Sequence, residues 1–288
     1  VDVFSRKNQI FRLTARENQD VNGYFMCDIG RYGFHRFEEI DRVFQPLMRN
    51  GETFDALDWD EAIQKTAKLI EQAKGKTARM GSPFHTNESN FLLGQMMAGI
   101  LGSLPPIRGE EINYPSGFRI SADRSPNLRG MTDICGEIAE DLPFELNARN
   151  ICGLYILDDG VDRDLDNTWK DILARMDFVI VQSYAMTDLA KSAHIVLPGL
   201  APFEREGTIT NDQGRVQWLR PSLPIQGEAK PDWEILALVM KEMDPGKLPM
   251  QDISQVMKEM GEKFPDYKGL SFFRLGSTGI SLNGRHEA

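Results

Sequence analysis

The fold is decided by the stretch "DFVIVQSYAMTDLAKSAHIVLPGLAPFEREGTITNDQGRVQ", residues 177–217. Two apolar runs, "DFVIVQ" at 177–182 and "HIVLPG" at 194–199, are separated by the helix-like segment "AMTDLAKSA". A Gly-punctuated loop rich in charged and amide side chains follows the second run. Short, fully apolar runs bounded by turn residues are typical of buried strands.

The pattern extends toward the N-terminus of the chain. Another apolar run, "ICGLYIL" at 151–157, precedes the helix-like segment "LDNTWKDILARM" at 165–176. The resulting β-α-β-α-β order, with strands that are apolar throughout, predicts a parallel sheet covered by helices on both faces. The fold class is therefore α/β.

Further helices flank this unit. "DWDEAIQKTAKLIEQAKG", residues 58–75, has one apolar face, with Asp58 as its expected N-cap. "TNESNFLLGQMMAGILGS", residues 86–103, begins near Thr86, and "DWEILALVMKEM" and a shorter segment near 251–261 are also helical in pattern. Residues 1–16 predict a β-hairpin, whereas 17–57 and 103–150 are expected to be mostly irregular.

Composition narrows the class of protein. The 288 residues are 41% hydrophobic and 26% charged, with a net charge of -10. This acidity disfavours a free nucleic-acid binder, and no apolar run approaches the roughly 18 residues that span a bilayer. Any membrane association would therefore come through partner subunits. Three scattered cysteines favour a reducing compartment over a disulfide framework. Since the chain begins with Val in a strand-like segment, we expect it to be part of a longer polypeptide.

Two stretches carry a family resemblance. Residues 15–34, "ARENQDVNGYFMCDIGRYGF", and the stretch 177–217 together resemble the molybdopterin oxidoreductase superfamily. Within it, they are most similar to the large iron-sulfur subunit (the G subunit) of NADH:quinone oxidoreductase, or respiratory complex I. The stretches "GSPFHTNES" at 81–89 and "ISADRSPNLRG" at 120–130 also look like that subunit. The resemblance covers most of residues 10–243.

The resemblance implies an architecture. We expect a compressed molybdopterin-oxidoreductase-like fold, with a parallel sheet flanked by helices, preceded by a small β and irregular subdomain of the iron-sulfur type. Its parts would be the remainder of a 4Fe-4S subdomain at 1–50, the α/β domain at 51–244, and a helical and irregular tail at 245–288.

The resemblance also implies a metal ligand. Cys27 lies in "MCDIGR", where family members place the last of four thiolates that hold a 4Fe-4S cluster. Its three companions would lie upstream, so Cys27 is either a ligand completed by another segment or a relic. Cys135 and Cys152 have no spacing relation to it, and we expect both to be structural, with Cys152 buried in a strand.

Other family-typical residues are replaced. Ile29 stands where molybdenum enzymes have a cation between cluster and pterin, and its alternative role is packing in the interior. Asp158 and Asp159 stand where a Gly-Asn-Pro type loop approaches the nucleotide. Two carboxylates repel a pyrophosphate unless a cation such as Mg²⁺ intervenes. We expect a solvated acidic turn there.

The loop after "IVLP" has two interpretations. Because open α/β sheets bind ligands at the carboxyl ends of their strands, Thr208, Asn211 and Gln213 are candidate contacts for a pterin or nucleotide. Alternatively, the loop is a rigid turn braced by internal charge pairs, of Glu204 or Glu206 with Arg205 or Arg215. The four histidines, His35, His85, His194 and His286, show no metal-ligand spacing.

These features imply a function within the family. The chain is expected to be a non-catalytic module, similar to the G subunit, of an NADH:quinone oxidoreductase (translocase), which supports electron transfer through iron-sulfur clusters and subunit assembly without molybdopterin. Its partners would be iron-sulfur and flavin subunits, and it would lie on the cytoplasmic face of the inner membrane through the complex. The alternatives are a module of a soluble NAD-linked hydrogenase or formate dehydrogenase, and a fragment of a true molybdenum reductase with a bis-guanine-dinucleotide pterin.

Overall fold

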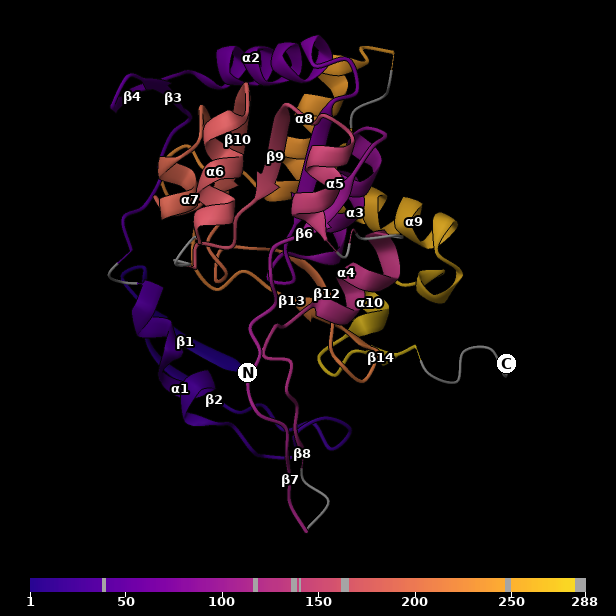
Figure 1. Cartoon of the computed structure of the whole chain (residues 1–288). Coiled ribbons are helices and arrows are strands. Elements are labelled where there is room, and N and C mark those ends of the chain that lie inside the picture. Colours follow the sequence, from indigo (N-terminus) through magenta and orange to yellow (C-terminus); the bar gives the residue numbers. More distant parts are fainter. Residues whose placement is uncertain are drawn as a thin grey trace.

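A seven-stranded sheet organises the molecule (Figure 1). The computed structural model describes residues 1–37, 40–115, 119–135, 139, 141–161, 166–246 and 250–282. The strand order is β4-β3-β11-β10-β9-β5-β6. Its strands are β3 (Leu47–Asn50), β4 (Thr53–Ala56), β5 (Thr77–Gly81), β6 (Leu101–Ser103), β9 (Gly153–Leu157), β10 (Phe178–Ser183) and β11 (Ile195–Pro198).

Five neighbouring strands, from β11 across to β6, are parallel, as the apolar runs predict. β10 pairs in parallel with both β9 and β11, and β5 pairs in parallel with β9 and β6. Every residue of β5, β9, β10 and β11 is buried. Burial on both faces explains why these strands have no polar-apolar alternation.

Helices cover both faces of the sheet (Figure 1). One apolar cluster joins alternate strand residues, such as Tyr155 and Ile180, to α2, α3 and α8, and a second joins Ile156 and Val181 to α5, α6 and α7. The helices are α2 (Trp59–Gln72), α3 (Asn87–Met96), α5 (Leu142–Ala148), α6 (Asn167–Arg175), α7 (Asp188–Lys191) and α8 (Asp232–Met243).

The predicted helix starts are confirmed. The Asp58 side chain accepts a hydrogen bond from the amide of Glu61, and Thr86 caps α3 by accepting from the amide of Ser89. These caps satisfy amides that have no partner within the helix. The apolar face of α2, including Ile63 and Ile70, is buried against the sheet as its periodicity predicts.

Residues 17–57 are more regular than predicted. β3 pairs antiparallel with β11 and with β4, so this segment adds two strands to the sheet edge. It also contains α1 (Asp28–Tyr32) and η1 (Gly33–Phe37). These elements are only four or five residues long, so periodicity carries little signal for them.

Residues 103–150 were also expected to be loop-rich, but they contain α4 (Leu128–Cys135) and α5. A thin antiparallel ribbon of β7 (Ile112–Asn113) and β8 (Arg119–Ile120) extends away from the body of the molecule (Figure 1). The predicted N-terminal hairpin is present as β1 (Asp2–Arg6) and β2 (Gln9–Thr14).

A second sheet, of three strands, is formed by residues that come after β11, the last strand of the main sheet. β12 (Gly207–Thr210) and β13 (Arg215–Leu219) form a hairpin, and β14 (Ile280–Ser281) pairs with β13. Between β13 and β14 the chain forms α8, α9 (Ile253–Lys263), η2 (Pro265–Tyr267) and α10 (Phe272–Leu275). Residues Val256, Met260 and Leu275 join the main apolar cluster, so this tail packs on the α/β body. Within the described residues, no helix is long and apolar enough to cross a membrane.

Candidate functional site

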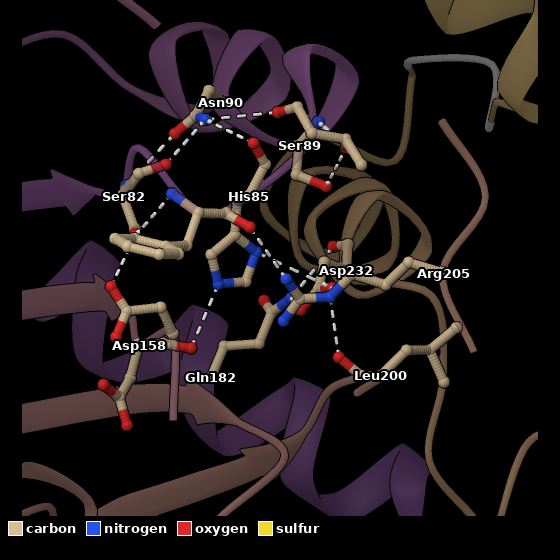
Figure 2. Close-up of polar contacts among 12 residues, drawn as sticks. Ser82, His85, Ser89, Asn90, Asp158, Gln182, Leu200, Arg205 and Asp232 are labelled. Atoms are coloured by element: carbon tan, nitrogen blue, oxygen red, sulfur yellow. Dashed lines mark hydrogen bonds and ion pairs between the residues drawn. The ribbon is translucent and has the colours of Figure 1, made fainter. Parts of the chain in front are cut away.

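Polar side chains converge where β5, β9 and β10 end (Figure 2). The loops after these parallel strands meet at one edge of the sheet, which is the ligand-binding edge of open α/β folds. Ser82 and His85 follow β5, Asp158 follows β9, and Gln182 lies at the end of β10. Arg205, from the loop after β11, and Asp232, at the start of α8, close the cluster.

Asp158 and Asp159 are not a solvated acidic turn, and that prediction is wrong. Their exposed fractions are 1% and 3%. Asp158 Oδ2 accepts hydrogen bonds from the hydroxyls of Ser183 at 2.9 Å and Thr187 at 2.7 Å. Asp159 Oδ2 accepts from the Ser82 hydroxyl at 2.8 Å. Hydroxyl groups of neighbouring segments thus satisfy the hydrogen bonding of the two carboxylates inside the protein.

His85 lies at the centre of the cluster (Figure 2). Its Nε2 donates to the backbone carbonyl of Asp158 at 3.0 Å, which assigns the ring proton to Nε2 in the neutral form. Nδ1 lies 3.7 Å from Oδ2 of Asp232. Complete burial, followed by the charge of Arg205, lowers the pKa of His85, while Asp232 opposes that shift.

Arg205 and Asp232 form a buried ion pair next to this histidine. Arg205 Nε lies 3.2 Å from Asp232 Oδ2 and donates to the carbonyl of Leu200 at 2.7 Å. Arg205 Nη1 donates to the Phe84 carbonyl at 3.0 Å. The guanidinium therefore ties the loop after β11 to the loop after β5 and to α8.

Gln182 completes the hydrogen bonding of Asp232. Its Nε2 donates to Oδ1 of Asp232 at 2.8 Å, and its Oε1 accepts from the hydroxyl of Tyr155 at 2.8 Å. Burial raises the pKa of Tyr155, which keeps the phenol protonated as a donor. A chain of buried hydrogen bonds therefore runs from β9 through β10 to α8.

The charged residues of the "EREGTITNDQGR" loop do not pair with one another as the brace interpretation expected. Glu204 receives two hydrogen bonds from the guanidinium of Arg42, at 3.1 and 3.0 Å. Arg205 pairs with Asp232, and Arg215 lies 2.9 Å from Asp20. These charges instead anchor the loop to three different, distant segments.

The loop also forms a second buried network, on β12 and α3. The amide and hydroxyl of Thr208 each donate to the carboxylate of Glu88 at 2.8 Å. The side chain of Asn87 donates to the hydroxyls of Thr208 and Thr210, both at 3.0 Å. The amide of Thr210 in turn donates to Oδ1 of Asn127 at 2.7 Å.

The three predicted pterin contacts do not lie together. Thr208 is buried against Glu88. Asn211 closes the β12–β13 turn, where its Oδ1 accepts from the amides of Gln213 at 3.1 Å and Arg215 at 2.8 Å. Gln213 is exposed in the turn. Their role in cofactor binding stays a prediction.

Cys27 and Ile29 lie on the N-terminal subdomain. Cys27 is exposed at the N-cap of α1, where its Sγ accepts from the amide of Gly30 at 3.3 Å. Ile29 is 82% exposed, so the alternative that it packs in the interior is wrong. The buried side chains of β2 pack with Phe34, and α1 has no buried residue of its own.

The remaining cysteines and histidines are scattered. Cys135 lies in α4, and burial raises the pKa of its thiol to about 12. Cys152 is half-buried just before β9, not within a strand as expected. His194 Nδ1 accepts from the amide of Val179 at 3.0 Å, which is a local contact at the strand end. His286 lies outside the described residues.

A bound metal would need a group of ligands at this edge, and a bound pterin would need hydrogen-bond donors. No group of three or more His, Cys, Asp or Glu side chains in the described parts of the chain is arranged to hold a metal ion. At the β9 end, a dinucleotide pyrophosphate would need hydrogen-bond donors. There the hydroxyls of Ser183, Thr187 and Ser82 already donate to Asp158 and Asp159. Among the described residues at this edge, these three hydroxyls therefore do not fit a pyrophosphate, because they already donate to carboxylates.

Several residues of the two networks were missed from the sequence. The sequence patterns place Glu88, Gln182 and Asp232 only within predicted helices or strands. A signal for Gln182 was available, because an amide at the end of an otherwise apolar strand requires a buried partner. Glu88 and Asp232 lie in the first turns of α3 and α8, where acidic residues are ordinary, so their burial had no local signal.

Comparisons with known proteins cover different parts of the chain. Residues 140–242 match the family described as Molybdopterin oxidoreductase. The F420-dependent formate dehydrogenase 2 subunit alpha of Methanococcus maripaludis is 34% identical over 188 residues, which are 62% of this chain and 27% of the relative. A putative formate dehydrogenase of Staphylococcus haemolyticus is 34% identical over 238 residues, or 75% of this chain and 24% of the relative.

Two further similarities concern a subunit of an NADH-quinone oxidoreductase and a solved structure. The G subunit of NADH-quinone oxidoreductase from Salmonella typhimurium is 38% identical over 92 residues, or 32% of this chain and 10% of the relative. The structure of acetylene hydratase from Pelobacter acetylenicus matches with a TM-score of 0.56 at 9% identity, over 90% of this chain and 69% of that one. The chain thus spans about a quarter of the length of the formate dehydrogenases. Residues 140–242 form a molybdopterin oxidoreductase family domain, and the chain has a molybdopterin oxidoreductase-like fold.

Proposed function

We propose that this chain is a non-catalytic module of a multi-subunit oxidoreductase of the NADH:quinone oxidoreductase type, in the role of part of the G subunit. It provides a rigid molybdopterin-oxidoreductase-like body that supports electron transfer through iron-sulfur clusters held nearby. Its partners are the iron-sulfur and flavin subunits, and it is peripheral on the cytoplasmic face of the inner membrane through them. The 38% identity over 92 residues to the G subunit of Salmonella typhimurium supports this assignment.

The observation that carries the proposal is the closed carboxyl edge. Asp158 and Asp159 occupy the end of β9 with two negative charges, and the nearby hydroxyls are turned onto them. Arg205, a cation of this cluster, is paired with Asp232. Because the edge is filled by its own side chains, we assign it a structural role and not the binding of a nucleotide.

A formate dehydrogenase-type module is the second candidate. It is supported by identities of 34% that extend over 62% and 75% of this chain, which is more of the chain than the similarity to the G subunit covers. In that case Thr208, Asn211 and Gln213 are the residues proposed to approach a pterin, after rearrangement of the β12–β13 turn.

Cys27 is the proposed ligand of a 4Fe-4S cluster in either case. Thiolates suit iron because they are soft, anionic donors. An exposed thiol at the start of α1 is accessible to a cluster whose other ligands come from outside residues 1–288.

The test is elemental and cofactor analysis of the native polypeptide that contains this chain, purified with its partner subunits. Iron, molybdenum and tungsten are measured by mass spectrometry, and pterin is measured by extraction and fluorescence. Iron without molybdenum, tungsten or pterin is the expected result. Stoichiometric pterin with molybdenum or tungsten would overturn the non-catalytic assignment and favour the formate dehydrogenase-type candidate.

A matched pair of variants tests Cys27. Cys27→Ser is expected to lower the iron content by about one cluster, whereas Cys135→Ser, which changes a buried thiol, is expected to leave it unchanged. Equal iron in wild type and Cys27→Ser would remove Cys27 from the ligand set.

A further inference from the structure

Glu88 is a buried carboxylate whose hydrogen-bond partners are all neutral. It lies in the first turn of α3 and is completely buried. Oε2 accepts from the amide of Thr208 and Oε1 accepts from its hydroxyl, both at 2.8 Å. A charged carboxylate in an apolar interior is costly unless a cation is paired with it.

Within the part of the chain that the structure describes, no cation provides that compensation. The elements packed against α3 carry these titratable groups: Arg79 on β5; Arg129, Asp133 and Cys135 on α4; Asp232, Glu234, Lys241 and Glu242 on α8; and Lys258, Glu259, Glu262 and Lys263 on α9. Among the described residues none of them forms an ion pair with Glu88.

The two buried arginines of neighbouring segments are committed elsewhere. Arg79 donates to the carbonyls of Leu93 and Gly94 in the second half of α3, at 3.0 and 2.8 Å. Arg205, two residues before Gly207, is paired with Asp232. Gly207 itself approaches so closely that a Cβ there would lie 2.8 Å from Glu88 Oε2, which leaves no room for a counter-ion on that side.

The neighbouring hydroxyl can accommodate either protonation state. With Glu88 ionised, the Thr208 hydroxyl accepts from Asn87 and donates to Glu88. With Glu88 protonated on Oε1, the same hydroxyl accepts from Glu88 and turns its hydrogen away. Asn87 Oδ1 is buried, and within the described residues it has no hydrogen-bond partner.

We propose that Glu88 is a proton-binding switch at the junction of α3 and β12, which holds the β12–β13 hairpin most firmly when it is protonated and loosens it when it ionises. Burial agrees with this assignment, because it raises the pKa of Glu88 to about 7, against the opposing hydrogen bonds of Thr208. The switch therefore acts near neutral pH.

The direction of the effect on stability follows from proton linkage. The folded-state pKa is about 7 and the unfolded value is 4.5. Between these values the folded chain keeps a proton that the unfolded chain has released, so stability falls as the pH rises through this window and is level above it. The folding equilibrium constant is expected to fall by roughly two to three orders of magnitude from this site.

The experiment compares unfolding by urea from pH 5 to pH 8.5 for the 288-residue chain and two variants. Glu88→Gln imitates the protonated side chain, because its amide accepts from the Thr208 amide and donates to the hydroxyl. We expect the fall in stability with pH to be lost in Glu88→Gln and kept in Glu259→Gln, which removes an exposed carboxylate of α9. An unchanged pH dependence in Glu88→Gln would overturn the proposal.

A direct titration protects the test against a variant that does not fold. The wild-type chain is labelled with ¹³C at the glutamate carboxyls, and Glu88 is identified as the resonance whose midpoint lies apart from the exposed glutamates. A midpoint between pH 6 and 8 is the expected result, and the proposal is wrong if every glutamate titrates below pH 5.5.

Discussion

The side chain of Arg205 meets that of Asp232 inside the protein, with Nε 3.2 Å from Oδ2 and both residues 4% exposed. The pair joins the loop after β11 to the first turn of α8. Its members are also hydrogen-bonded to Leu200 and Gln182. A buried ion pair with this support is costly to break on one side, because the remaining charge is left in the interior.

The first prediction concerns this pair. Asp232→Asn and Arg205→Met are each expected to lower the free energy of unfolding by roughly 3–5 kcal/mol. The double variant is expected to lose less than the sum, because it leaves no unpaired charge. Urea unfolding measures all three.

The control is an exposed ion pair. Lys65 lies 3.3 Å from Glu61 on the surface of α2, and Lys65→Gln is expected to change stability by less than about 0.5 kcal/mol. If the two single variants of the buried pair proved as mild as this control, the pair would not hold the edge together.

The second prediction concerns Gly130 on α4. A Cβ at this position would lie 2.2 Å from Oδ1 of both Asn127 and Asn87 and 2.9 Å from the hydroxyl of Thr210. Gly130→Ala is expected to destabilise the chain by about 1–3 kcal/mol, because these buried side chains must move. Thermal or urea unfolding measures the change.

Gly94 provides the matched substitution. It also lies in a helix, α3, but a Cβ there meets nothing within 4 Å. Gly94→Ala is expected to raise stability by up to about 1 kcal/mol, because Ala favours the helix more than Gly does. Equal effects at the two positions would contradict the close packing assigned to Gly130.

The third prediction concerns thiol reactivity. Cys27 is exposed, whereas Cys135 is largely buried with its pKa raised to about 12 by burial. The thiolate is the reactive species, so a small alkylating agent at neutral pH is expected to modify Cys27 first and Cys135 only on unfolding. Mass spectrometry of peptides after timed alkylation gives the order, and early modification of Cys135 would show that α4 opens readily.

The fourth prediction concerns the attachment of the C-terminal segment. The hydroxyl of Tyr267 lies 2.9 Å from that of Thr210. Tyr267→Phe is expected to cost about 1–2 kcal/mol, because a buried hydroxyl of Thr210 loses a partner. Tyr32→Phe, at an exposed tyrosine of α1, serves as its control and is expected to have no measurable effect. A comparable loss in both variants would argue against the Thr210 contact.

The parallel part of the sheet could be predicted from the sequence. β9, β10 and β11 are apolar runs, and a segment with helical periodicity lies between each run and the next. The edge strands β3 and β4 could not be predicted. Their residues, such as Arg49 and Thr53, show no clear apolar pattern, and they become strands only by pairing with β11 and with each other. Tertiary pairing of this kind leaves no local signal.

The candidate site was predictable in position but not in detail. The carboxyl edge follows from the topology. The interpretation of Asp158 and Asp159 failed because their donors, Ser183, Thr187 and Ser82, come from other segments of the chain. Similarly, one of the two interpretations of the 204–215 loop paired its charges locally, whereas Glu204 forms hydrogen bonds with the distant Arg42. Burial of a charged residue depends on such distant partners.

The three-stranded sheet limits the order in which the chain can fold during its synthesis. In the β12–β13 hairpin, Arg215 pairs with Asp20, the Thr210 hydroxyl lies beside that of Tyr267, and β13 pairs with β14. Contacts that join residues far apart in the chain form late, after the entropy of closing the long loops between them has been lost. The ribosome must therefore release more than 60 further residues before this hairpin can acquire its last neighbours. Until then its edge strand has unpaired backbone groups, which makes the interval after β13 the period of greatest exposure to wrong strand pairing.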